Sequence, residues 1–163
     1  MSNDVIAAAK YNFDSITSKV AYEDADALGL EVVLPQDDQL QIDIDDEAAY
    51  AVYLGNRQRY EIHFLDNPIK FAEEKPSRSG EPGKKHITVT LTEPVSNEKR
   101  ILLQALLGSD PVREMLSYVR LANDDDYPTL FMEKPAPKQL EAAPEHLMLG
   151  PGDFVEPADE GAY

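Results

Sequence analysis

The chain has 163 residues, with 15 lysine and arginine residues against 31 aspartate and glutamate residues, and its formal net charge at pH 7 is −16. This length is typical of one domain with a buried core, and the absence of cysteine excludes a disulfide framework and thiolate metal sites. No apolar run approaches the roughly 18 residues that a membrane span requires, and no basic segment precedes an apolar one at the amino terminus. The composition therefore predicts a cytoplasmic protein without a membrane partner.

The negative charge is unevenly distributed along the chain. Residues 67–100 carry a net charge of +2, so the rest of the chain sums to −18. A strongly acidic surface repels phosphate backbones, which argues against nucleic-acid binding by the molecule as a whole. We expect any contact with an anionic ligand to involve residues 67–100.

The first half of the chain predicts two strands and a long helix. Residues 1–29 have weak periodicity and predict a loosely ordered start with at most a short helix. Residues 30–35 and 39–45 have the composition of strands and are separated by a turn. Acidic residues followed by alanines, and tyrosines at helical spacing, then predict a helix over 46–64 with Asp46 as its N-cap.

The next segment predicts two strands joined by a flexible loop. Residues 68–75 alternate weakly and predict an edge strand, and 76–85 hold two prolines and two glycines, which predicts a loop. The clearest strand of the chain follows at 86–93. Its alternation predicts one apolar face and one polar face: Ile87, Val89 and Leu91 opposite His86, Thr88 and Thr90.

Two helices and a last strand complete the pattern. Ser96 is a suitable N-cap for a helix that Gly108 ends, and Asp110 caps a second helix with Pro111 at its first position. The second helix is predicted to have an apolar stripe formed by Val112, Met115, Leu116 and Val119. Residues 129–133 predict the last strand.

These elements predict an α+β domain over residues 30–133, with a small mixed or antiparallel sheet packed against about three helices. Residues 134–163 contain five prolines and have a net charge of −4, which predicts a disordered acidic tail. We find no internal repeat.

Asp43 and Asp45 alternate with isoleucines in the stretch LQIDIDDEAAY. On a strand, residues two apart project from the same face, and two carboxylates at a strand end can bind divalent cations. The spacing alone is weak evidence, because an acidic chain produces such pairs by chance and this one has three. Only this pair lies on an apolar strand that runs into a helix; the others are Asp24/Asp26 and Asp124/Asp126.

His86 opens the clearest strand, directly after a loop in which Gly80 and Gly83 allow the backbone to approach a ligand closely. Three nearby cations are suited to phosphate: Arg78, Lys84 and Lys85. The alternative interpretation is an ordinary hairpin with a solvated histidine.

Asp110 also has two interpretations. Its position before Pro111 is explained by helix capping alone. Arg113 follows one turn later and Arg120 two turns after that, so the acid and the arginines could also complete a phosphate or metal site.

Taken together, the order of these features resembles the catalytic core of the archaeo-eukaryotic primase superfamily, in its primase-polymerase branch. The matching segments are IDID on a strand that leads into a helix, SGEPGKKH leading into a strand, and GSD further on. The resemblance covers about residues 30–133.

The resemblance implies a nucleotidyltransferase of DNA replication that uses two divalent ions, Mg²⁺ or Mn²⁺. It implies that Asp43, Asp45 and Asp110 are catalytic residues that hold the metal, and that His86 contacts the phosphates of the incoming nucleotide. Its partners would be a nucleoside triphosphate and nucleic acid. We expect four cations to assist in nucleotide binding: Arg78, Lys84, Lys85 and Arg113.

The sequence departs from the family pattern at two points. The loop before His86 contains the extra residues EPGKK, and Asp110 precedes a proline-initiated helix, whereas the third acid of the family sits on a strand. Glu114 and the cluster Asp124–Asp126 are therefore alternatives for the third acid.

Two other functions fit the composition. A non-enzymatic interaction protein, such as an inhibitor, adaptor or nucleic-acid mimic, would engage a basic protein surface through its acidic residues and tail. A regulatory subunit would use the domain only as a scaffold. The small, acidic, cysteine-free chain is similar in composition to bacteriophage early proteins. The enzyme hypothesis is favoured if His86 faces Asp43 and Asp45 within one cleft.

Overall fold

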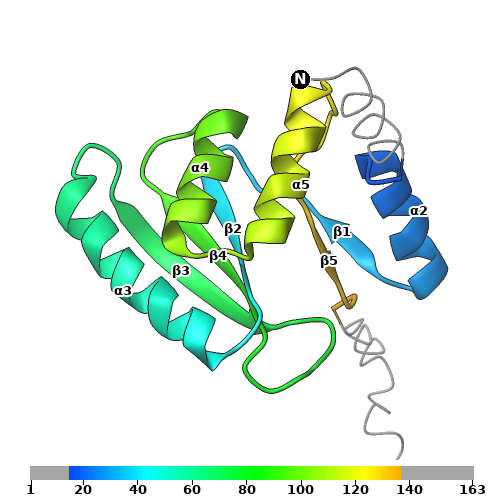
Figure 1. Ribbon diagram of the computed structural model, residues 1–163, viewed down its shortest axis with the longest axis horizontal. Helices are drawn as coiled ribbons and strands as arrows, with labels where there is room; N and C mark the ends of the chain where they lie inside the picture. Colours follow the sequence, from blue (N-terminus) through cyan, green and yellow to red (C-terminus); the bar gives the residue numbers. More distant parts are fainter. Residues whose placement is uncertain (1–14, 137–163) are drawn as a thin grey trace, which may run out of the picture.

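The computed structural model describes residues 15–136, and within this range the chain forms four helices and five strands (Figure 1). In chain order they are α2 (Ser18–Leu28), β1 (Glu31–Val33), β2 (Gln39–Ile44), α3 (Glu47–His63), β3 (Ile69–Pro76), β4 (Lys85–Leu91), α4 (Asn97–Leu107), α5 (Pro111–Ala122) and β5 (Phe131–Glu133). The α+β class is confirmed. The predicted acidic tail lies almost entirely outside the described residues.

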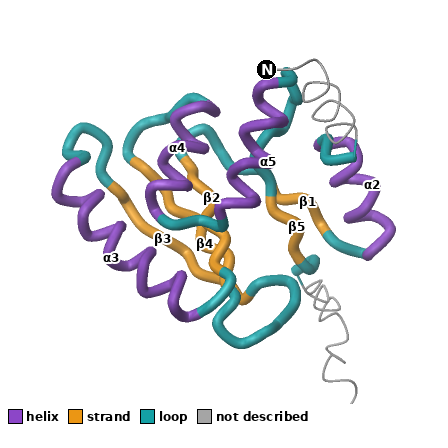
Figure 2. Tube along the Cα trace, viewed as in Figure 1, coloured by secondary structure: helices purple, strands orange, loops and turns teal. Residues whose placement is uncertain are grey.

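The central sheet has three antiparallel strands in the order β2-β4-β3 (Figure 2). In its register Ile42 lies opposite Ile87, and Asp43 lies opposite His86. This pairing joins the two stretches that carry the candidate chemistry, although 42 residues separate them in the chain.

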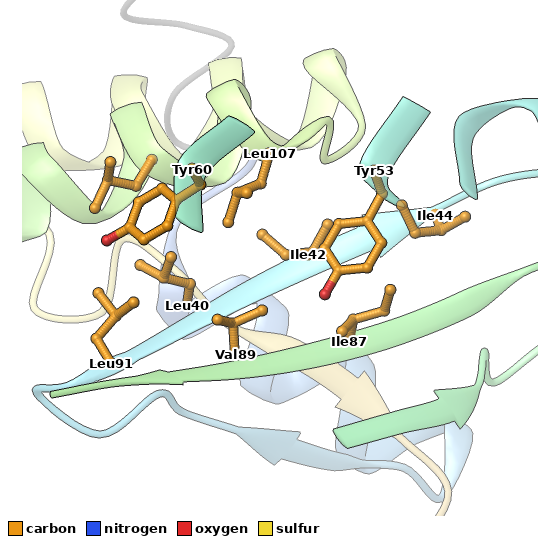
Figure 3. Close-up of a cluster of buried hydrophobic side chains, with 10 residues drawn as sticks. Leu40, Ile42, Ile44, Tyr53, Tyr60, Ile87, Val89, Leu91 and Leu107 are labelled. Carbon is orange, nitrogen blue, oxygen red and sulfur yellow. The ribbon is translucent and has the colours of Figure 1, made fainter. Parts of the chain in front are cut away.

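One face of the central sheet carries the hydrophobic core (Figure 3). Ile42 and Ile87 are fully buried there, as are Tyr53 and Tyr60 from α3 and Leu107 from α4. Burying one such side chain contributes about 1.5–3 kcal/mol, so this face supplies much of the folding free energy. The predicted apolar face of β4 is thus confirmed.

A two-stranded antiparallel ribbon of β1 and β5 lies beside the central sheet, with α2 next to β1 (Figure 1). Both strands are shorter than the sequence predicts, with three residues each. The Gln41 side-chain amide donates to the Val33 carbonyl at 2.9 Å, which ties the ribbon to β2.

The predicted helix caps are confirmed. The side chains of Asp46, Ser96 and Asp110 accept hydrogen bonds from backbone N–H groups of the first turns of α3, α4 and α5. Gly108 ends α4 in the left-handed conformation, with φ of 94°, which a residue with a Cβ adopts only at a cost. No helix within residues 15–136 is both long and apolar enough to cross a membrane.

The apolar stripe predicted for α5 does not face the core. Met115 is 66% exposed, whereas the next residue toward the amino terminus, Glu114, is only 4% exposed. Met115 instead lines, with Leu102 and Tyr118, an apolar groove of about 490 Å³ between α4 and α5. α5 instead packs a polar face, which includes Glu114, against a sheet edge.

That edge is the outer side of β2, whose backbone groups have no neighbouring strand. The Gln41 N–H donates to Gln104 Oε1 at 2.9 Å, and the Asp43 N–H donates to Ser109 Oγ at 3.0 Å. The Gln41 carbonyl accepts from the Arg113 guanidinium at 2.8 Å. Side chains of α4, α5 and their connection therefore replace a missing strand, because buried backbone groups require partners.

Glu114 connects these side chains. Its carboxylate accepts hydrogen bonds from Gln104 Nε2 at 2.8 Å, Ser109 Oγ at 2.7 Å and Arg113 Nη1 at 2.6 Å. A buried carboxylate is tolerated only when it is paired and hydrogen-bonded in this way.

Candidate functional site

A pocket of about 280 Å³ opens where β2, β4, β5 and the first turns of α5 converge. Six of the residues proposed from the sequence line it: Asp43, Arg78, His86, Asp110, Arg113 and Arg120. They come from four separate segments of the chain, so the fold collects them into one place.

Asp43 and His86 face each other across the pair β2–β4. His86 Nε2 lies 3.7 Å from Asp43 Oδ1. His86 is only 8% exposed, so the alternative of a solvated histidine is wrong. The two residues are on the face of the sheet opposite the core, because Ile42 and Ile87 occupy the other face.

Burial raises the pKa of Asp43 above its ordinary value, and the nearby carboxylates of Asp45 and Asp110 raise it further. The charges of His86 and Arg113 act in the opposite direction without outweighing burial. The ionised carboxylate of Asp43 is thus disfavoured in the folded protein, and a cation bound in the pocket would stabilise it.

Asp110 serves as a helix cap at the edge of the same pocket. Its carboxylate accepts from the N–H groups of Val112 and Arg113 at 3.3 and 3.0 Å, and its own N–H donates to the Asp43 carbonyl at 2.9 Å. The backbone contact fixes the start of α5 against β2. Capping is confirmed, and it leaves Asp110 within the pocket lining.

Three arginines line the pocket: Arg78, Arg113 and Arg120. Arg113 donates to the carbonyls of Gln41 and Leu130, and its guanidinium carbon lies 4.4 Å from the centre of the Phe131 ring. Arg78 is exposed, and its guanidinium approaches the sulfur of Met132 at 3.7 Å. Arg113 is therefore held in place, while Arg78 stands at the mouth of the pocket.

Two contacts of His86, one with a carboxylate and one with an aromatic ring, were not expected from the sequence. Its Nδ1 lies 3.4 Å from Glu133 Oε1, and its ring stacks on Phe131 at 4.1 Å. Both partners belong to β5, and no local pattern indicates that this strand passes beside β4.

Three of the proposed residues are not brought into the pocket. Asp45 follows the end of β2 and is exposed. Lys84 pairs with Glu81 at 2.7 Å, and Lys85 pairs with Glu74 at 3.6 Å. Adjacent residues on a strand project to opposite faces, so Lys85 is directed away from the side on which His86 lies.

The alternative third acids do not line the pocket. Glu114 is buried in the network at the edge of β2 and is fully hydrogen-bonded. Asp124–Asp126 lie in the turn that follows α5. Asp110 is the remaining candidate of the three.

No group of three or more His, Asp or Glu side chains within residues 15–136 is arranged to hold a metal ion. Asp43 and Asp110 nevertheless offer carboxylate oxygens at one pocket. Mg²⁺ is commonly held by one or two carboxylates together with water and substrate phosphates, rather than by a cage of protein ligands. The donors fit an ion that binds together with a phosphorylated ligand.

Comparison of the chain with protein family models, curated proteins and solved structures found no match.

Proposed function

We propose that the pocket binds a nucleoside triphosphate with Mg²⁺ or Mn²⁺, and that the protein is a primase-polymerase-like nucleotidyltransferase of DNA replication in the cytoplasm. One observation supports this most strongly: Asp43, His86 and Asp110, three of the four residues that the family resemblance singles out, line one pocket together with Arg113. With Asp45 outside the pocket, the geometry supports one ion rather than two.

In this proposal the acids of the pocket bind the ion and the arginines bind the phosphates. Asp43 and Asp110 would hold the ion, which supplies charge neutralisation at the phosphates and at the leaving group. Arg113 is immobilised by backbone carbonyls, by Glu114 and by Phe131, which engage its Nη1 and Nη2 groups. Its Nε–H remains to bind a phosphate oxygen without a large entropy loss. Arg78 would reach the ligand from the mouth of the pocket.

His86 changes partner in this proposal. In the structure its Nε2 faces the Asp43 carboxylate at 3.7 Å. If Asp43 held the ion, its charge would be neutralised, and a protonated Nε2 of His86 could then donate to a phosphate oxygen. Positioning and electrostatic stabilisation of this kind account for most of the catalysis of phosphoryl transfer.

Calorimetric titration tests the binding step. We expect Mg²⁺ or a nucleoside triphosphate alone to bind weakly, and the two together to bind well, because neither the protein nor the nucleotide completes the ion's ligands alone. Asp43→Asn should abolish this joint binding. Absence of any joint binding to the unaltered protein would refute the proposal.

The matched control uses an aspartate pair with the same sequence spacing. Asp24 and Asp26 lie on α2 and are exposed. Replacing both by Asn removes more charge than Asp43→Asn, yet should leave nucleotide binding unchanged. An equal loss in both proteins would indicate a general charge effect.

A second measurement tests the chemistry. The protein is supplied with a primed single-stranded template, Mg²⁺ or Mn²⁺ and labelled nucleoside triphosphates, and incorporation of label is followed. Binding without incorporation would refute the transferase part of the proposal and leave a nucleotide-binding protein.

The apolar groove between α4 and α5 favours protein binding as a second candidate function. Leu102, Met115 and Tyr118 are exposed there, and contiguous exposed apolar side chains commonly mark interaction sites. The acidic tail of the adaptor hypothesis lies outside the described residues. Capture of partners from host lysate at low and high salt separates the two routes, since only binding through acidic residues is weakened by salt.

A further inference from the structure

The orientation of His86 is controlled by two side chains of β5. Phe131 stacks on the imidazole at 4.1 Å between ring centres with an interplanar angle of 2°, and Glu133 Oε1 lies 3.4 Å from Nδ1. Residues two apart on a strand share a face, so the three-residue strand β5 presents both side chains to His86.

The stack and the carboxylate constrain different properties of the ring. The contact with Phe131 fixes the plane of the imidazole. A half-turn about the Cβ–Cγ bond leaves that plane unchanged but exchanges the positions of nitrogen and carbon atoms. A carboxylate accepts hydrogen bonds only, so Glu133 favours the orientation and the tautomer in which Nδ1 carries the proton.

Asp43 is the other carboxylate beside the ring, at 3.7 Å from Nε2. It differs from Glu133 in two respects. Its contact is longer, and it lines the pocket, whereas Glu133 does not. A ligand or ion that enters the pocket therefore competes for Asp43 but leaves the contact between His86 and Glu133 in place.

We propose that Glu133 is a positioning residue of the candidate site: it accepts the Nδ1 proton of His86 and thereby directs Nε2 toward Asp43 and into the pocket. Nε2 donates to a phosphate oxygen of the ligand when it also carries a proton. The effect of Glu133 on ligand affinity depends on the proposed function. Its effect on the imidazole does not, so the two can be tested separately.

Nitrogen NMR of the histidine side chains tests the positioning role directly. The chain has three histidines, His63, His86 and His146, and the variant His86→Gln identifies the signals of His86. Spectra are recorded in alkaline solution, at a pH where the signals show that the ring is neutral. We expect the Nδ1–H tautomer to predominate for His86, although free histidine prefers the Nε2–H form.

Glu133→Ala should shift His86 toward the Nε2–H form. Glu133→Gln retains the shape of the side chain, keeps the proposal testable if the alanine variant does not fold, and should give a mixture, because an amide both donates and accepts. Glu31 pairs with Glu133 in the ribbon and is exposed, so Glu31→Gln is the matched control and should change nothing.

An unaltered protein with the Nε2–H tautomer at His86 would overturn the proposal, as would a tautomer that is the same with and without the Glu133 carboxylate. Nucleotide affinity gives the second readout. Loss of a residue that orients a ligand-binding group typically costs about 10–100-fold in affinity, and we expect a loss of this order for Glu133→Ala. If the unaltered protein binds no nucleotide, the proposed function fails while the spectra still decide the role of Glu133.

Discussion

Asp110 combines a structural contact and a candidate ligand in one side chain. Its carboxylate caps α5 and lines the pocket, and its backbone N–H donates to the Asp43 carbonyl. Loss of the carboxylate therefore affects both the helix and the pocket. Stability and ligand binding can be separated here, because asparagine caps helices as well as aspartate does but carries no charge.

Asp110→Asn should therefore keep the free energy of unfolding close to that of the unaltered protein, while Asp110→Ala should lower it by about 1 kcal/mol. Both variants should lose joint binding of Mg²⁺ and nucleotide. Urea unfolding and calorimetry measure the two properties. Unchanged nucleotide binding by Asp110→Asn would show that Asp110 acts only as a helix cap.

The residues of the site differ in how far the sequence could predict them. The cap at Asp110 follows from local rules, since Pro111 comes next. The meeting of Asp43 and His86 was predicted only as a consequence of the family resemblance. Phe131 and Glu133 were not predicted, because their contacts depend on where the β1–β5 ribbon packs, and no residue of β5 encodes that locally.

At the scale of an element, α5 shows how packing can override a helical pattern. The helical spacing of apolar residues predicts a stripe that includes Met115, but the surface on which α5 packs is the unpaired edge of β2. Glu114 is buried there because backbone N–H groups and the Arg113 guanidinium need a polar network. The other edge strand, β3, carries charged residues and ends at Pro76, which discourages strand addition.

Substitution of the two neighbours tests this interpretation. Glu114→Ala leaves the Arg113 charge without its buried partner and should lower the free energy of unfolding by about 3 kcal/mol. Met115→Ala alters an exposed side chain and should change it by less than about 0.5 kcal/mol. The denaturant midpoint of each variant measures the difference. The reverse order would contradict the role of Glu114 as the buried partner of Arg113.

At the scale of the whole molecule, the folded unit begins earlier than residue 30. α2 packs beside β1, and its first N–H group, at Ser18, donates to Asp125 Oδ2 at 2.8 Å. Arg120 donates to the Ile16 carbonyl nearby. The sequence predicted only a short helix here, since contacts more than 100 residues apart leave no local signal.

The contact between α2 and the turn after α5 should depend on pH. Burial opposes ionisation of Asp125, but hydrogen bonds from Ser18 and Tyr127 and the charge of Arg120 outweigh it and lower the pKa of Asp125. A lowered pKa means that the carboxylate stabilises the fold at neutral pH, and that this stabilisation is lost as the pH falls through the folded-state pKa.

Asp125→Ala should therefore reduce the free energy of unfolding by about 1 kcal/mol at pH 7, the size of a lost cap. The difference from the unaltered protein should shrink as the pH falls below the ordinary pKa of aspartate, 3.8. Thermal unfolding across this range measures it, and a difference that is independent of pH would contradict the role of the ionised carboxylate.

The side chains that take the place of a strand along β2 affect amide hydrogen exchange. The N–H groups of Gln41 and Asp43 are protected by Gln104 and Ser109, not by a neighbouring strand. Gln104 and Ser109 are themselves buried, so water reaches these two N–H groups only when α4 and α5 separate locally from the edge of β2. Exchange at these two positions thus reports local opening of the strand that carries Asp43.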